Sequence, residues 1–131
     1  MDAPTFVKRV SELTGLDKDH ADRAVRATLV MLGTRIDPGE ADDLAAQVPD
    51  HFAHCLRNEW QAESFPPTEF VRRVTCVVPL SNEQARGAVR AVFTVLSEAV
   101  SKGELEDVLL QLEADYTQLV GMPTGRNLQR L

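Results

Sequence analysis

Residues 21–36 read ADRAVRATLVMLGTRI, and residues 85–100 read ARGAVRAVFTVLSEAV. The two stretches lie 64 positions apart and share the run AVRA. Their apolar residues recur at steps of three and four, which is the spacing of one face of an α-helix and not that of a strand. Both stretches are therefore predicted to form long amphipathic helices of about five turns each.

The match between these stretches extends over most of the chain without a gap. Sliding the sequence against itself by 64 positions pairs identical residues before, within and after the two long helices. The pairs include Phe6 with Phe70, Arg9 with Arg73, Gly39 with Gly103, Glu40 with Glu104, Asp43 with Asp107 and Gln47 with Gln111. Self-similarity at a fixed offset indicates repeated structural units. We therefore predict two copies of one unit, residues 5–56 and residues 68–120.

Apolar spacing divides each unit into about four helices. A short helix is predicted ahead of each long one, over residues 4–14 and over residues 67–78. Two shorter helices are predicted after each long one, and the last of them cover about residues 50–58 and residues 114–120. The expected total is about eight helices.

Capping residues mark where the long helices begin and end. Asp17 precedes the first of them, and Ser81 with Gln84 three residues later has the pattern of a capping box before the second. Gly39 and Gly103 follow the two helices, and glycine readily adopts the left-handed conformation that closes a last turn. We expect both long helices to end at these glycines.

The fold class that follows is an all-α helical bundle made of two tandem repeats related by a pseudo-two-fold rotation. Residues 1–120 are expected to form a single globular domain. Its shared core is predicted to contain Ala24, Val25 and Leu32 with their counterparts Ala88, Val89 and Leu96. The alternative is two separate bundles joined by a hinge at Pro66-Pro67.

Two segments lie outside the predicted repeats. Residues 57–67 are expected to form a connector anchored by Trp60 and Phe65, since its paired prolines stop one helix and start the next. Residues 121–131 contain two glycines and a proline with little periodic apolar content. We expect this tail to be flexible.

Composition and charge exclude several classes of protein. The 131 residues are 44% apolar and 26% charged, as in soluble globular domains. The formal net charge of −6 at pH 7 repels a phosphate backbone, so no nucleic-acid partner is expected. No apolar run approaches the roughly 18 residues that a membrane span needs, and the first residues do not resemble a signal peptide. A cytoplasmic protein without membrane contact is expected.

The stretch GEADDLAAQVP at residues 39–49 resembles a signature of the bacterial family called domain of unknown function 2267. The starts of the two units, FVKRV at residues 6–10 and FVRRV at residues 70–74, are similar to a motif that recurs in the same family. The chain departs from the pattern at Asp37-Pro38-Gly39, and at Glu113, where the second unit lacks a proline. The resemblance implies a helical fold. It implies no catalytic residue, substrate or cofactor.

The sequence DHFAHC at residues 50–55 is the candidate metal site with zinc-type ligands. His51 and Cys55 lie one helical turn apart, and His54 adjoins Cys55. A zinc site needs three or four ligands, and the second unit offers Asp115, Gln118 and Leu119 at the corresponding positions. We favour surface histidines beside a buried cysteine, and we expect no metal and no cofactor.

Acidic residues open the helix after each long one. Glu40, Asp42 and Asp43 correspond to Glu104, Glu106 and Asp107. Placed near a pseudo-two-fold axis, these carboxylates could coordinate a hard cation. The favoured interpretation is that they oppose the positive end of the helix dipole.

Four arginines recur in both units, while most other charges do not. Arg9 corresponds to Arg73, and Arg26 corresponds to Arg90. A repeated charge suggests a repeated partner. We predict structural ion pairs between these arginines and the repeated acids, which are Glu40, Asp43, Glu104 and Asp107.

No motif in the sequence indicates catalysis, since the chain lacks a nucleophile elbow and a phosphate-binding glycine loop. The distinctive repeated positions are helix caps, core residues and charged residues. We therefore favour a non-catalytic module that binds a protein partner or associates with itself. The alternative is a small-molecule binding protein or an enzyme that uses the groove between the repeats. A pocket of a few hundred Å³ near Phe52, Trp60, Phe65 or Tyr116 would favour the alternative.

Overall fold

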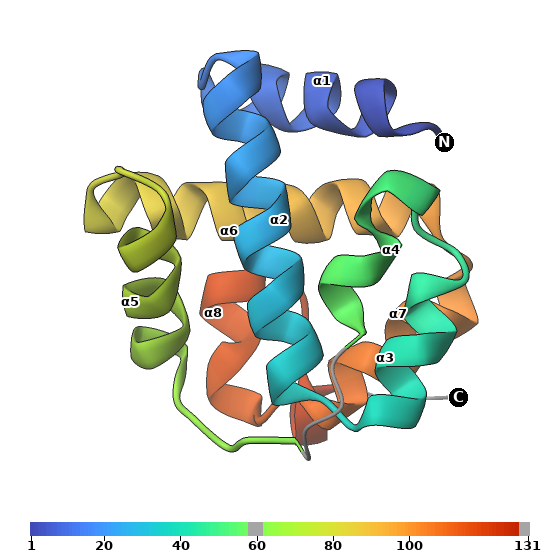
Figure 1. The fold of residues 1–131 in the computed structure, drawn as a ribbon. Helices are drawn as coiled ribbons and strands as arrows, with labels where there is room; N and C mark the ends of the chain where they lie inside the picture. The colour runs from blue at the N-terminus through green and yellow to red at the C-terminus, as the bar shows by residue number, and fades with distance from the viewer. Residues whose placement is uncertain (58–61, 129–131) are drawn as a thin grey trace.

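The computed structural model describes residues 1–57 and 62–128, and over these residues the chain is all-α. Figure 1 shows the eight α-helices, and no strand occurs in the described part of the chain. The helices are α1 (Ala3–Thr14), α2 (Lys18–Arg35), α3 (Pro38–Ala45), α4 (Asp50–Leu56), α5 (Pro67–Val77), α6 (Asn82–Ala99), α7 (Lys102–Gln111) and α8 (Thr117–Val120). Two 3-10 turns, η1 (Ala114–Tyr116) and η2 (Gly125–Asn127), complete the fold. No helix within these residues is long and apolar enough to cross a membrane.

Side-chain caps start the long helices where the sequence predicts them. The Asp17 carboxylate accepts a hydrogen bond from the His20 N–H at the start of α2. The Ser81 hydroxyl accepts one from the Gln84 N–H, and the Gln84 side chain in turn accepts one from the Ser81 N–H. This is the capping box that was predicted for α6.

The predicted glycine ends of the long helices are wrong. Helices α2 and α6 end at Arg35 and Ala99, and each is followed by a residue with extended backbone. Gly39 and Gly103 instead lie inside the first turns of α3 and α7, and neither has a positive φ. Proline fits the first turn of a helix and forces its predecessor to be extended, so Pro38 starts α3 and does not only stop α2.

Helices α2 and α6 cross at the centre of the molecule (Figure 1). The six residues predicted for the core of these helices have no exposed surface. Residues of both helices belong to one cluster of buried side chains. Helix α1 contacts both α2 and α6, and α5 also contacts both. Because each first helix bridges the two long ones, two separate bundles joined by a hinge do not fit these contacts.

The halves of the chain differ after their third helices. Helices α2 and α6 each have 18 residues, and their bounds lie 64 positions apart. In the first half the seven-residue helix α4 follows α3, whereas in the second half η1 and the four-residue α8 follow α7. Helix α4 packs against α2, and α8 packs against α6.

The tail is packed as far as Leu128, in contrast to the flexible tail that was predicted. Thr124 is fully buried, and its hydroxyl donates a hydrogen bond of 2.7 Å to the Glu113 carbonyl. The Thr124 N–H donates to the hydroxyl of Thr117. Hydroxyl hydrogen bonds therefore hold this segment where apolar periodicity is absent. Residues 129–131 lie outside the described residues.

The predicted connector is described only in part. Its anchor Phe65 is buried, and the Phe65 carbonyl accepts a 2.6 Å hydrogen bond from the hydroxyl of buried Tyr116. Phe52 is also buried, so these three aromatics belong to the core. The other predicted anchor, Trp60, lies outside the described residues.

Candidate functional site

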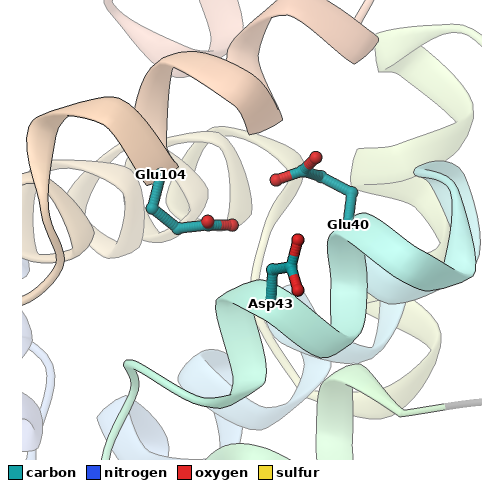
Figure 2. Close-up of side chains that lie close together, drawn as sticks. All are labelled: Glu40, Asp43 and Glu104. Atoms are coloured by element: carbon teal, nitrogen blue, oxygen red, sulfur yellow. The ribbon is translucent and has the colours of Figure 1, made fainter.

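The α3–α7 contact brings three carboxylates together. Asp37 caps α3, so Glu40 and Asp43, three residues apart, lie on one face of that helix. Ser101 caps α7 and places Glu104 in its first turn. Ligand oxygens of Glu40, Asp43 and Glu104 all lie within 4.8 Å of one another. Figure 2 shows the three side chains converging from the two helices, and we call them the carboxylate cluster.

Two oxygens of the carboxylate cluster are shielded from solvent. Glu40 Oε1 and Glu104 Oε1 are buried atoms without a hydrogen-bond partner. Burial raises the pKa of Glu104 to about 7, with a hydrogen bond from Glu40 and the charges of Glu40, Asp43 and Asp107 acting in the same direction. The Glu104 carboxyl is therefore harder to ionise than a carboxyl in water.

Two glutamines hold the same contact from either side. The Gln111 side chain of α7 accepts a 2.7 Å hydrogen bond from the Asp37 N–H, and the Gln47 side chain accepts a 2.8 Å hydrogen bond from the Ser101 N–H. Each glutamine thus gives a hydrogen-bond partner to the backbone N–H of the residue that caps the opposite helix. Sequence reasoning missed this role. The signal was present, because Gln47 and Gln111 are identical at paired positions near the ends of their helices.

The predicted meeting of the acidic turns occurs for part of the set. Glu40, Asp43 and Glu104 converge, whereas the Asp42 carboxylate lies 3.6 Å from Nε of Arg57. Carboxylate oxygens are the ligands that Mg²⁺ and Ca²⁺ prefer. The carboxylate cluster is therefore the part of the described chain that could hold a hard cation.

The repeated arginines of the first helices have other partners than the predicted ones. Arg9 of α1 makes a two-pronged contact with Glu98 of α6, at 3.0 Å and 2.8 Å. Arg73 of α5 bonds to Glu69 at 2.7 Å and also pairs with Glu63. Since α1 packs across α6, Arg9 reaches the acid at the end of that helix and not the start of α3 or α7.

The repeated arginines of the long helices also differ from the prediction. Arg26 bonds to Asp22 at 2.8 Å, contacts the His51 ring and lies over the ring of Phe52. Arg90 donates instead to the carbonyl of Gln118. The two arginines face the last helix of their own half, which is α4 for the first and α8 for the second. Sequence alone does not show which helix a repeated charge faces.

The zinc-type candidates do not converge. His51 contacts Arg26, and its ring packs edge-on against Phe52. Nε2 of His54 lies 3.7 Å from Sγ of Cys55. Burial raises the pKa of the Cys55 thiol, and the Asp22 charge adds to this, which disfavours the thiolate that zinc binds. Within the described residues, the group of three ligand side chains is the carboxylate cluster and includes none of these.

A groove runs along the outer face of α6. Three adjoining hollows of about 290, 400 and 290 Å³ share lining residues and extend from the end of α1 to α8 and the start of α5. We name this the α6 groove, and its defining residues are Leu13, Leu16, Gly87, Arg90 and Leu119. Gly87 lies mid-helix, and a Cβ added there would meet no atom within 4 Å. The missing side chain therefore deepens the groove.

A separate cavity of about 550 Å³ lies beside Arg35 at the end of α2. Arg35 is 7% exposed and pairs with Glu113, while its Nε is buried without a partner. Its guanidinium lies 5.9 Å from the centre of the Tyr116 ring. The other walls come from residues 110–115 and from Gly125 and Arg126, so the lining belongs to the second half of the chain except for Arg35.

Comparison with known proteins identifies the family of this chain. The family model described as "Uncharacterized conserved protein (DUF2267)" matches residues 3–119. A search of curated proteins found no match. The matched span includes the carboxylate cluster and all the lining residues of the α6 groove. The chain therefore belongs to the DUF2267 family.

Proposed function

We propose that this protein is a non-catalytic interaction module that docks a segment of a protein partner in the α6 groove. The observation that carries the proposal is Gly87. Glycine in the interior of a helix costs about 1 kcal/mol relative to alanine, and here the space for a side chain is open. A residue that weakens its helix and leaves a hollow is consistent with a surface kept open for a partner.

The groove lining indicates the chemistry of the partner. Leu13 is 45% exposed and lies with Leu16 at one end, next to Gly87. Arg86 and Arg90 line the middle of the groove, in a chain whose net charge is negative. We infer a partner segment that carries apolar side chains beside acidic ones.

Within the described residues, the corresponding face of α2, in the first half, has no such groove, which supports a single docking site on α6. Arg23 stands on α2 where Gly87 stands on α6. Arg26 is engaged by Asp22 and His51, so a polar network covers the face that is hollow in the second half. The proposed module therefore has one docking face and not two.

We further propose that residues 1–120 form one domain of two repeats related by a pseudo-two-fold rotation. The paired bonds of Gln47 and Gln111 support this, as do the contacts of α1 and α5 with both long helices. Superposing residues 5–56 on residues 69–120 in an experimental structure tests it. Helices that fail to overlay one by one would contradict the repeat.

The docking proposal is tested by blocking the groove at Gly87. Wild-type protein and Gly87→Trp are used to capture partners from the cells that make the protein, and any candidate is then purified and titrated. We expect a partner that binds the wild type and loses at least about tenfold in affinity for Gly87→Trp, or about 1.4 kcal/mol. Sedimentation of the purified protein tests a second copy of the chain as the partner.

The matched control is Gly103→Trp. Gly103 is also an exposed helical glycine with no atom within 4 Å of an added Cβ, but it lies on α7, away from the groove. The proposal requires Gly103→Trp to keep the affinity of the wild type. A purified partner that binds both tryptophan variants equally well contradicts docking in the α6 groove.

The cavity beside Arg35 supports a second candidate function, the binding of a small molecule. Its volume of about 550 Å³ is of the size that ligand pockets have. Mass spectrometry of the protein purified from its own cells, natively and after denaturation, tests this candidate. A retained small molecule that Leu110→Trp displaces supports it, whereas a retained compound that this variant leaves in place contradicts it.

A further inference from the structure

Arg35 is the buried charge in the wall of the cavity at the end of α2. The residue is only 7% exposed, and it lines the cavity. Glu113 pairs with its Nη2, but Nε is buried without a hydrogen-bond partner. A buried donor on a charged group is costly when no acceptor meets it. The pairing of this guanidinium is therefore incomplete.

Other arginines of the chain show what complete pairing requires. Arg9 donates to Glu98 through both Nε and Nη2, at 3.0 Å and 2.8 Å. Arg72 donates to Glu69 through the same two nitrogens, at 2.6 Å and 2.7 Å. One carboxylate can thus fill this edge of a guanidinium with its two oxygens. Glu113 fills only half of the same edge on Arg35.

Glu113 is not buried with its partner. Its side chain is 46% exposed, and it also accepts a 3.3 Å hydrogen bond from the Ser64 hydroxyl. A carboxylate that already contacts water regains its hydration when it moves away from the guanidinium. Glu113 can therefore give way to a better-placed anion.

The rest of the cavity has the chemistry of a site for a small organic acid. Its volume of about 550 Å³ lies within the range of ligand pockets. Leu110, which is 38% exposed, forms an apolar wall with Leu112 and Ala114. Arg126 of η2 lines the same cavity, and among the described residues it has no ion-pair partner. An apolar wall thus lies in one cavity with two guanidinium groups.

We propose that this cavity binds a small organic acid, whose carboxylate or phosphate takes both Nε and Nη2 of Arg35 in place of Glu113. The apolar body of the ligand lies against Leu110, and Arg126 supplies a second positive charge. The inference rests on the second candidate function, the binding of a small molecule, and names its ligand class. It does not depend on the α6 groove.

The two acids that line the cavity have different effects on such a ligand. Glu113 and the ligand compete for one guanidinium, so the charge of Glu113 opposes binding directly. Asp115 also lines the cavity, but it is exposed. Water and salt screen an exposed charge. Removing the charge of Glu113 should therefore strengthen binding more than removing that of Asp115.

The test titrates three small compounds into the purified full-length protein after any retained compound has been dialysed away. The compounds are 3-phenylpropanoate, phenyl phosphate and the neutral 3-phenylpropanamide, and NMR of nitrogen-15-labelled protein follows them. We expect both anions to shift the Arg35 Nε–H resonance and to bind at least about tenfold more tightly than the amide, or about 1.4 kcal/mol. The tighter anion shows whether carboxylate or phosphate is preferred.

Two outcomes separate this inference from small-molecule binding in general. If the amide binds as tightly as the anions and Leu110→Trp blocks all three compounds, the cavity binds small molecules and the preference for an acid is overturned. If neither anion shifts the Arg35 Nε–H resonance, the inference is overturned as well. The second candidate function is then judged by the compound that the protein retains from its own cells.

The matched variants are Glu113→Gln and Asp115→Asn. Both remove one negative charge from the lining at an exposed residue, and both keep the buried Arg35 in place. Glu113→Gln should raise the affinity for 3-phenylpropanoate by about threefold or more and leave that for the amide unchanged. Asp115→Asn should change the affinity for the acid by less than about twofold. Equal gains in the two variants would overturn the displacement of Glu113.

Discussion

The last helix of each half packs against the long helix of that half, but the two contacts differ. In the first half Gly33 of α2 lets the backbone of α4 approach, since a Cβ at this position would lie 2.5 Å from the Leu56 carbonyl oxygen. In the second half Ser97 occupies the corresponding position and is exposed. There α8 is held through Arg90 and ends at the left-handed Gly121. Similar sequences therefore form a close backbone contact between α2 and α4, but a contact through the Arg90 side chain between α6 and α8.

The largest effect is expected where the first half is tightest. Gly33→Ala places a methyl group against the backbone of Leu56, which cannot rotate away as a side chain would. We expect a loss of about 1 to 3 kcal/mol in the free energy of unfolding, measured by urea denaturation. Ser97→Ala in the second half should stay within about 0.5 kcal/mol. Equal losses at the two sites would remove the distinction between the halves.

The next effect concerns the turn after α8. Gly121 has a φ of 82°, a region that costs other residues about 1 to 2 kcal/mol. Gly121→Ala should lower the thermal midpoint accordingly, whereas Arg57, the counterpart in the first half, has extended backbone. Arg57→Ala should change stability by less than about 0.5 kcal/mol. A neutral Gly121→Ala would show that α8 does not need this turn.

A gain in stability is expected at Gly87. Gly87→Ala removes backbone entropy from the unfolded chain and meets open space, so α6 should gain up to about 1 kcal/mol. Arg23→Ala at the counterpart on α2 should change stability by a few tenths of a kcal/mol, since both residues favour helices. Chemical denaturation of the two variants measures the difference. A loss of stability in Gly87→Ala would mean that the space beside Gly87 is already occupied.

The smallest effect is expected for the repeated arginines. Arg26 bonds to Asp22 and lies over Phe52, but its side chain is 35% exposed. Arg26→Ala should cost about 0.5 to 1 kcal/mol. Arg90→Ala, which removes one bond to the Gln118 carbonyl, should cost less. If Arg90→Ala proves the more damaging, the second half depends more on this contact than its geometry indicates.

Most helices could be predicted because their signals are local. The apolar periodicity of α2 and α6 and the caps at Asp17 and Ser81 depend on residues a few positions apart. The prediction that the long helices end at Gly39 and Gly103 was wrong, because a glycine after one helix can also lie in the first turn of the next. Pro38 starts α3, so Gly39 belongs to that helix. The packing of residues 121–128 left no signal in the sequence, because buried Thr124 is held by hydroxyl hydrogen bonds and not by a periodic apolar pattern.

The partners of the repeated charges could not be predicted in the same way. Identity at paired positions singled out Glu40 and Glu104, which were predicted to pair with the repeated arginines, and it was also present at Gln47 and Gln111. It did not show that the two glutamates face each other or that each glutamine bonds to the opposite cap. Glu40 lies close to its counterpart Glu104 at the contact between α3 and α7, whereas Arg9 contacts Glu98 of α6.

The sequence by itself determined the all-α class, the positions of most helices and the family of this protein, because helix propensity, capping and periodic burial act over short distances. Only the tertiary structure decided how α2 and α6 cross, that α1 and α5 bridge them, and that the acids of α3 and α7 converge. Those outcomes depend on packing between residues far apart in the chain. The buried oxygens of the carboxylate cluster and the open face at Gly87 arise from that packing.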